Sequence, residues 1–198
     1  MSMATIGRRE LLLLLVGLDD PTERGLGGIT RIQKLLFLLD AEENIKPGAE
    51  GFKFVAYKAG PYSPKIYDDL EFLENFGFLK RSGYSEATEA EKSEVDLTFE
   101  ELMGPEDVIG ASEEDVAPTP DTYEEARYHI TPEGKKKVEE LLRQQQYQPF
   151  IEGIRKVKSR FAKYSLNDLL YYVYTRHPEM TTESEIKEKV LRRRPMRH

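Results

Sequence analysis

The sequence predicts a mainly α-helical protein with a small antiparallel sheet. Apolar residues recur at helical spacing in several stretches, most clearly in GPYSPKIYDDLEFLENFGFL at residues 60–79. A glycine stops that helical pattern and a short strand pattern follows it, while residues 126–130 offer a second strand. Three helices followed by a two-stranded wing predict a winged helix-turn-helix-like domain, to which further C-terminal helices are added.

Length and composition indicate a protein that folds without cross-links. The chain has 198 residues, enough to bury an apolar core, and it contains no cysteine. The apolar run Leu11–Val16 follows two arginines, but it is too short to span a bilayer and no small-residue cleavage site follows it. We therefore expect a buried helix over residues 6–18 in a soluble, cytoplasmic protein with no membrane partner.

Charge is distributed unevenly along the chain. The net charge is −7, yet residues 84–126 alone hold 15 acidic residues and one basic residue, a net charge of −14. Residues 127–198 hold 17 basic and 9 acidic residues, a net charge of +8. The overall acidity therefore comes from one segment, and the average charge says little about the partners of the rest.

The second predicted helix covers residues 30–40. Thr30 followed by Gln33 has the spacing of a capping box, which would start the helix at that threonine. Its apolar stripe consists of Ile32, Leu35, Leu36 and Leu39. Residues 41–51 are expected to form a loop, and the alternating aromatic residues in 52–57 predict a strand.

The third predicted helix lies inside residues 60–79. Ser63 is a good N-cap, Pro64 suits the first helical position, and Gly77 can adopt the left-handed conformation that ends a helix. The expected buried stripe consists of Ile66, Leu70, Leu73 and Phe76. Residues 78–82 should then pair with residues 126–130 as the two strands of the wing.

The acidic segment 84–126 forms an insert between the two wing strands. Val95, Leu97 and Phe99 alternate with charged residues and are compatible with a strand or an edge hairpin, but prolines interrupt the later part of the insert. Self-repulsion of the carboxylates favours an extended, solvated loop. An acidic lure for a basic partner, or a strip that masks the protein's own basic face, is the alternative interpretation.

The C-terminal part predicts four more helices. The expected starts are Thr131 before Pro132, Pro149, Ser165 with Asp168, and Thr182 with Glu185. We divide the chain into a winged-helix-like domain at residues 1–145 and a helical extension with a basic tail at residues 146–198.

The sequence shows no constellation that predicts catalysis. The histidines are His129, His177 and His198, and none has a second histidine or a cysteine at metal-ligand spacing. Ser63 and Ser165 sit where helices are expected to begin, without a nucleophile elbow around them. We therefore expect a protein that is not an enzyme and has no catalytic residues, metal site or cofactor.

Tyrosines are the candidate partner-binding residues. The candidates are Tyr62, Tyr67, Tyr171, Tyr172 and Tyr174. Tyrosine combines a large apolar ring with a polar tip, which suits protein interfaces. The tyrosines at 171–174 cover more than one face of their helix, so burial of that helix between two layers is the competing interpretation.

Two segments resemble the Panacea-domain proteins, which are known as antitoxin-like modules. These segments are KLLFLLD at 34–40 and VAYKAGPYSPKIYDDL at 55–70, and the resemblance covers residues 28–80. It implies a non-enzymatic fold that binds and neutralises a toxin-like protein partner or serves as an adaptor. The acidic insert and the helical extension depart from the family pattern, so no binding residue is carried over. The same stretch also resembles winged-helix transcription regulators.

DNA binding is the alternative function. Winged-helix regulators place their third helix in the major groove and use basic residues on phosphates. The candidate nucleic-acid contacts are Lys58, Lys65, Lys80, Arg81, Arg155, Lys156, Lys158 and Arg160. The outer face of the third helix carries Asp68, Asp69, Glu71 and Glu74 instead. Like charge on that face favours a protein partner over DNA.

Overall fold

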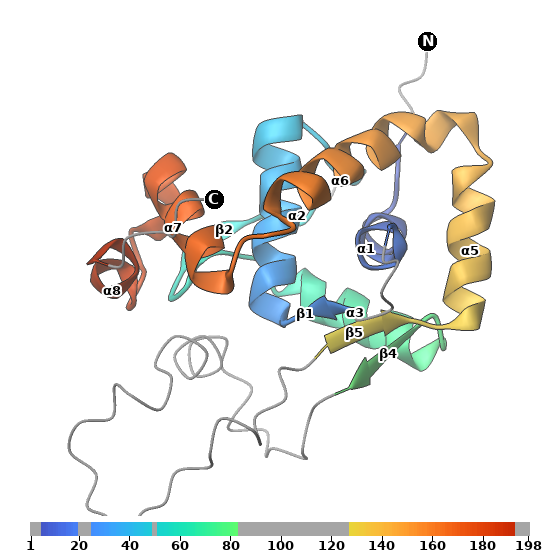
Figure 1. The fold of residues 1–198 in the computed structure, drawn as a ribbon, viewed down its shortest axis with the longest axis horizontal. Helices are drawn as coiled ribbons and strands as arrows, with labels where there is room; N and C mark the ends of the chain where they lie inside the picture. Colours follow the sequence, from blue (N-terminus) through green and yellow to red (C-terminus); the bar gives the residue numbers. More distant parts are fainter. Residues whose placement is uncertain (1–4, 20–24, 49–50, 83–126, 193–198) are drawn as a thin grey trace, which may run out of the picture.

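The structure is a computed structural model, and it describes residues 5–19, 25–48, 51–82 and 127–192. It is mainly helical with a small antiparallel sheet, as expected (Figure 1). The elements are α1 (Arg8–Gly17), β1 (Leu26–Gly27), α2 (Ile29–Glu43), β2 (Val55–Tyr57), β3 (Gly60–Tyr62), α3 (Lys65–Asn75), β4 (Leu79–Ser82), β5 (Arg127–Ile130), α5 (Pro132–Leu142), η3 (Gln145–Tyr147), α6 (Gln148–Phe161), α7 (Leu166–Arg176), η4 (Pro178–Thr181) and α8 (Lys187–Arg192).

Helix α1 lies at the centre of the molecule. Figure 1 looks nearly along its axis and shows α6, α5 and the sheet arranged around it. Every residue from Leu11 to Val16 is buried, and α1 packs against α3, α5, α6 and β5. A helix that is apolar on all sides needs this enclosure because it has no polar face to turn to water. The expected buried helix is therefore confirmed.

The main sheet has three strands in the order β1–β5–β4, all antiparallel. Leu79 lies opposite Ile130 and Ser82 lies opposite Arg127, which confirms the expected pairing of residues 78–82 with 126–130. Strand β1 was not expected, because its two residues lie in a glycine-rich turn region with no strand pattern.

Helix α3 buries most of its expected stripe. Ile66, Leu70 and Leu73 are buried, but Phe76 is 62% exposed, so its assignment to the core was wrong. Phe76 caps the helix, where the backbone leaves helical geometry, and its ring stacks on Phe72 with centroids 4.1 Å apart. Gly77, at φ 73°, then ends the helix as expected.

Two expected helix caps were also wrong, for one shared reason. Helix α2 starts after Gly28 rather than at Thr30, and the hydroxyl of Ser63 donates to the carbonyl of Phe52 instead of capping α3. The side chain of Gln33 donates to the Ser63 carbonyl at 3.0 Å and accepts from the Ser63 N–H at 2.9 Å. These buried polar groups bond across the fold, so their sequence spacing carried no capping information.

Of the caps expected for the C-terminal helices, those at Thr131 and Ser165 are confirmed and the one at Thr182 is wrong. Thr131 accepts a hydrogen bond from the N–H of Gly134, and Ser165 forms a capping box with Asp168, so both expected caps are confirmed. Thr182 and Glu185 do not start the last helix, which begins only at Lys187. The N–H of Glu185 donates instead to the carbonyl of Lys58 at 2.9 Å, which ties this turn to the hairpin loop.

Between α2 and α3 the chain forms a hairpin rather than one strand. Helix α2 continues to Glu43, and the strand expected at 52–57 is limited to β2, which pairs with β3. Gly60 makes this turn possible, since its φ is 90° and a Cβ there would lie 2.9 Å from a ring carbon of Tyr174.

Helices on both sides of residue 145 share one buried core. The core contains Ile154 and Val157 of α6 and Leu170 of α7 together with the leucines of α1 and α2. The division into two domains stays a prediction. The acidic insert and the end of the basic tail lie in 83–126 and 193–198, outside the described residues.

The different burial of two α3 residues can be tested directly. Leu73→Ala should lower the free energy of unfolding by about 2–5 kcal/mol, because it leaves a cavity in the core. Phe76→Ala should lower it by less than about 1 kcal/mol, because most of the ring is already in water. Urea titrations of both variants and the unmutated protein measure this, and a larger loss for Phe76→Ala than for Leu73→Ala would contradict the placement of α3.

Candidate protein-binding surface

A row of tyrosine rings lies on the hairpin and on α3. The rings of Tyr57 and Tyr62 are 4.7 Å apart, and those of Tyr62 and Tyr67 are 6.0 Å apart. Tyr57 is 39% exposed, and Val55, which lies opposite Tyr62 across the hairpin, is 53% exposed. We call Tyr57, Tyr62 and Tyr67 the tyrosine row. Tyr62 and Tyr67 are partly buried, so the row is a contiguous aromatic surface that is most exposed at Tyr57. An aromatic surface of this kind suits a protein interface.

The backbone beneath the tyrosine row is held in place by the core. The buried ammonium of Lys34 on α2 donates to the carbonyl of Pro61 at 3.1 Å. The hairpin also packs against η4, and Gly60 lies under the buried ring of Tyr174. A surface fixed in this way loses little conformational entropy when a partner binds.

The exposed face of α3 beside the row is acidic. Asp68 and Glu71 are exposed. Burial raises the pKa of Glu74, the neighbouring charge of Glu71 adds to this, and Arg81 opposes it. Asp69 was expected on the same face, but it is fully buried and binds Arg8 and Arg9 of α1. The remaining carboxylates leave α3 poorly suited to phosphate.

The basic residues expected near the third helix already have contacts within the chain. Lys58 lies 3.4 Å from the carboxylate of Glu185, and Arg81 lies 3.8 Å from that of Glu74. Lys65 donates to a backbone carbonyl at 3.4 Å. Lys80 is exposed on β4. Such pairs reduce the positive charge that a nucleic acid would meet.

Basic residues of α6 form ion pairs with acidic residues at the C-terminal ends of α1 and α2. Each ion pair joins α6 to a residue more than a hundred positions away in the sequence. The pairs are Arg155 with Asp19 at 3.1 Å, Lys156 with Glu43 at 2.6 Å and Arg160 with Glu42 at 2.7 Å. Lys158 donates to the carbonyl of Leu18. These contacts therefore fasten α6 to its neighbours.

The C-terminal tyrosines do not join the tyrosine row. Tyr174 is 2% exposed and its hydroxyl lies 2.8 Å from that of Ser184, so it packs inside the fold and offers no surface. The hydroxyl of Tyr172 donates to Glu42 at 2.9 Å. Tyr171 is partly buried against the core. Burial of α7 between layers accounts for Tyr174, whereas Tyr62 and Tyr67 remain at the candidate surface.

Glu42 is the centre of a polar network that joins α2, α6 and α7. Burial alone would raise its pKa, but hydrogen bonds from Tyr172 and His177 and the charge of Arg160 outweigh burial and lower the pKa. Burial and the hydrogen bond to Glu42 raise the pKa of Tyr172, so its hydroxyl stays a donor at neutral pH. The network favours an ionised Glu42.

Sequence reasoning missed part of this surface. Val55 and Tyr57 were assigned to a strand but not to a site, although their period-two spacing places them on one face. Of the histidines, His129 bonds Ser82 at 2.6 Å and His177 lies 3.2 Å from Glu42, while His198 is outside the described residues. Within the described ranges, no cluster of potential metal ligands occurs.

No helix in the described part of the chain combines the length and the apolar character needed to cross a membrane. Comparison with protein-family models, with curated proteins and with solved structures found no match to this chain.

The Glu42 network predicts a pH-dependent contribution to stability. Because its pKa is lowered on folding, Glu42 stabilises the protein above its unfolded pKa, and this contribution disappears as pH falls through the folded pKa. Glu42→Gln should cost about 1 kcal/mol at pH 7. The difference from the unmutated protein should shrink between about pH 5 and pH 3.

Urea titrations across this pH range measure the difference, and Glu133→Gln is the control, because Glu133 is an exposed carboxylate on α5 whose ion pair to Lys136 is 3.9 Å long. A cost that stays constant with pH would show that the ionised carboxylate is not what stabilises the fold.

Proposed function

We propose that this chain is a non-enzymatic protein-binding module of winged-helix type whose interface is the tyrosine row. The observation that supports this most is the contiguous row of rings, in which Tyr57 is exposed and Tyr62 and Tyr67 are partly buried, next to the exposed Val55. Tyrosine rings give large contact areas with few rotatable bonds and are enriched at energetically important interface positions. Lys34 of α2 holds the backbone that carries the row, so little conformational entropy is lost when a partner binds.

The order of elements supports the winged-helix assignment. Three helices, α1, α2 and α3, precede two antiparallel strands, β4 and β5, which is the element order of a winged helix. One feature departs from a simple helix-turn-helix. The β2–β3 hairpin stands between α2 and α3, where that motif has a turn of about three or four residues. The tyrosine row uses this added hairpin.

The resemblance to Panacea-domain proteins suggests an antitoxin-like or adaptor role with a toxin-like partner. Its two segments, 34–40 and 55–70, contact each other through Lys34 and Pro61. The contact explains how the two segments work together, because Lys34 holds strand β3, which carries Tyr62.

DNA binding is the second candidate, favoured by the wing itself and by the exposed Lys80 on β4. The acidic outer face of α3 opposes it, since counterion release at phosphates requires basic residues. We expect at most weak, salt-sensitive binding of DNA, on the order of 10⁻⁴–10⁻⁶ M.

The proposal is tested with any small toxin-like protein that is encoded beside this gene, co-produced with the full chain. We expect a complex, measured by size-exclusion chromatography and calorimetry. Replacing Tyr57 and Tyr62 together by Ala should weaken it at least tenfold, because truncation of a central aromatic anchor costs about 2 kcal/mol or more. Tyr147→Ala, in η3, is the control and should leave the affinity unchanged.

Two outcomes would contradict the proposal. One is an unchanged affinity in the double variant while its melting temperature stays normal. The other is nanomolar, sequence-selective binding of duplex DNA by the intact protein at physiological salt, which would make the chain a DNA-binding regulator instead.

A further inference from the structure

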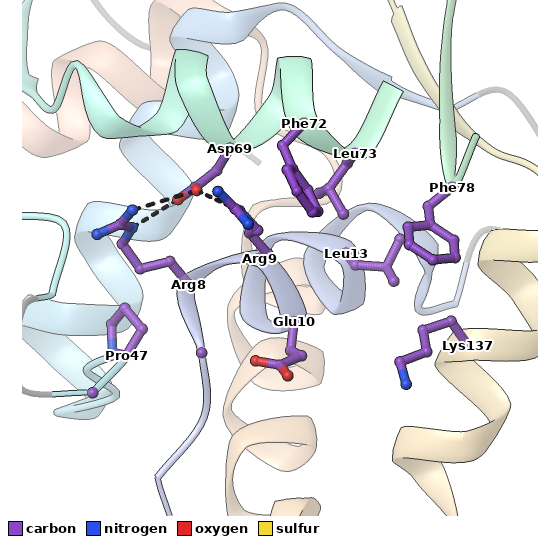
Figure 2. A pocket seen from close by; sticks show the side chains of 12 residues that line it. Arg8, Arg9, Glu10, Leu13, Pro47, Asp69, Phe72, Leu73, Phe78 and Lys137 are labelled. Atoms are coloured by element: carbon purple, nitrogen blue, oxygen red, sulfur yellow. Dashed lines mark hydrogen bonds and ion pairs between the residues drawn. The ribbon is translucent and has the colours of Figure 1, made fainter. Parts of the chain in front are cut away.

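A groove of about 490 Å³ runs along the N-terminal half of α1, between α3 and α5. Figure 2 shows Leu13 at its floor, with Phe72 and Phe78 above and Lys137 on the far wall. Its volume lies within the range of small-molecule sites, and apolar walls with few polar groups are typical of them. The groove shares no residue with the tyrosine row.

One end of the groove is lined by two arginines, Arg8 and Arg9, and by the carboxylate of Asp69. Asp69 is fully buried and accepts from Arg8 Nε at 2.7 Å and from Arg9 Nε at 3.1 Å. Both guanidinium groups therefore bond the same carboxylate. Figure 2 shows both arginines turned toward Asp69 at the same edge of the groove.

Arg9 is the residue of this pair that can serve a ligand. Its side chain is 48% exposed, and its guanidinium carbon lies 3.5 Å from the centre of the Phe72 ring. Its bond to Asp69 uses Nε, so both terminal nitrogens keep donors for an anion. Stacking on Phe72 fixes the plane of these donors, which favours a carboxylate that accepts two parallel hydrogen bonds.

Glu10 and Lys137 are the other charged residues that line the groove. Glu10 is turned toward Gly7, where a Cβ would lie 2.0 Å from its carboxylate oxygen, and Figure 2 shows it pointing away from Lys137. Lys137 is paired with Glu140 at 3.1 Å. The partly exposed guanidinium of Arg9 at one end, the apolar middle and the phenylalanine rings suit an elongated amphipathic ligand.

We propose that this groove binds a small aromatic monocarboxylate. The carboxylate accepts hydrogen bonds from the terminal nitrogens of Arg9, and the aromatic body lies between Leu13, Phe72 and Phe78. An aromatic body suits these walls because ring edges and faces pack favourably against phenylalanine. The site is independent of the proposed protein-binding surface.

The test uses 3-phenylpropanoate as the probe and 3-phenylpropanamide as its uncharged counterpart, with the full chain. Calorimetry and saturation-transfer NMR should show saturable binding of the acid with Kd below about 1 mM. The amide should bind at least tenfold more weakly, because it cannot form the charge-assisted pair. Equal binding of the two compounds, or no saturable binding of either, would overturn the proposal.

A variant locates the site. Arg9→Gln should weaken binding of the acid at least tenfold and leave binding of the amide unchanged, while Arg8 keeps Asp69 paired. Lys136→Gln is the matched control, since Lys136 neighbours Lys137 on α5 but does not line the groove. Unchanged binding in Arg9→Gln would overturn the assignment. If Arg9→Gln does not fold, the comparison of acid and amide on the unmutated protein still decides.

Discussion

The burial of Leu11–Val16 in α1 is the constraint on which the rest of the structure depends. Leu11–Val16 has no polar position, so water must be kept from every side of the helix. Burying one such side chain contributes roughly 1.5–3 kcal/mol. Summed over six residues, this is roughly 9–18 kcal/mol, which is comparable to the net stability of a typical domain, about 5–15 kcal/mol. The fold therefore requires the elements that pack around α1, which are α3, α5, α6 and β5.

This constraint explains why the C-terminal helices belong to the same core. Helix α6 packs against α1. Ion pairs join its basic residues to acidic residues at the ends of α1 and α2. Helix α7 packs against α2 and places the ring of Tyr174 against Gly60. The hairpin is fixed from both sides as a result, and this is what makes the tyrosine row a rigid surface.

The sequence predicted those features that depend on local spacing. Ile66, Leu70 and Leu73 lie on one helical face. Thr131 and Ser165 cap the helices that begin directly after them. Prediction failed where the partner is distant along the chain. Gln33 bonds Ser63 and not its own helix start, and nothing in local spacing reveals that choice.

The candidate sites follow the same division. In the sequence, the basic stripe of α6 resembles a phosphate-binding surface. In the folded chain, Asp19, Glu43 and Glu42 form ion pairs with it. The tyrosine row was half predicted, since Tyr62 and Tyr67 were candidates but Tyr57 joins them only across the hairpin. The groove beside α1 was not predicted because its walls come from four separate segments.

Native-state hydrogen exchange of the amides in α1 tests the central claim most directly. If Leu11–Val16 is held in the core, the amides of Leu14, Leu15 and Val16 exchange only when the whole protein unfolds. Their exchange free energies should equal the global value from urea titration, while those of α8 should be lower. Exchange of the α1 amides at several kcal/mol below the global value would contradict the account.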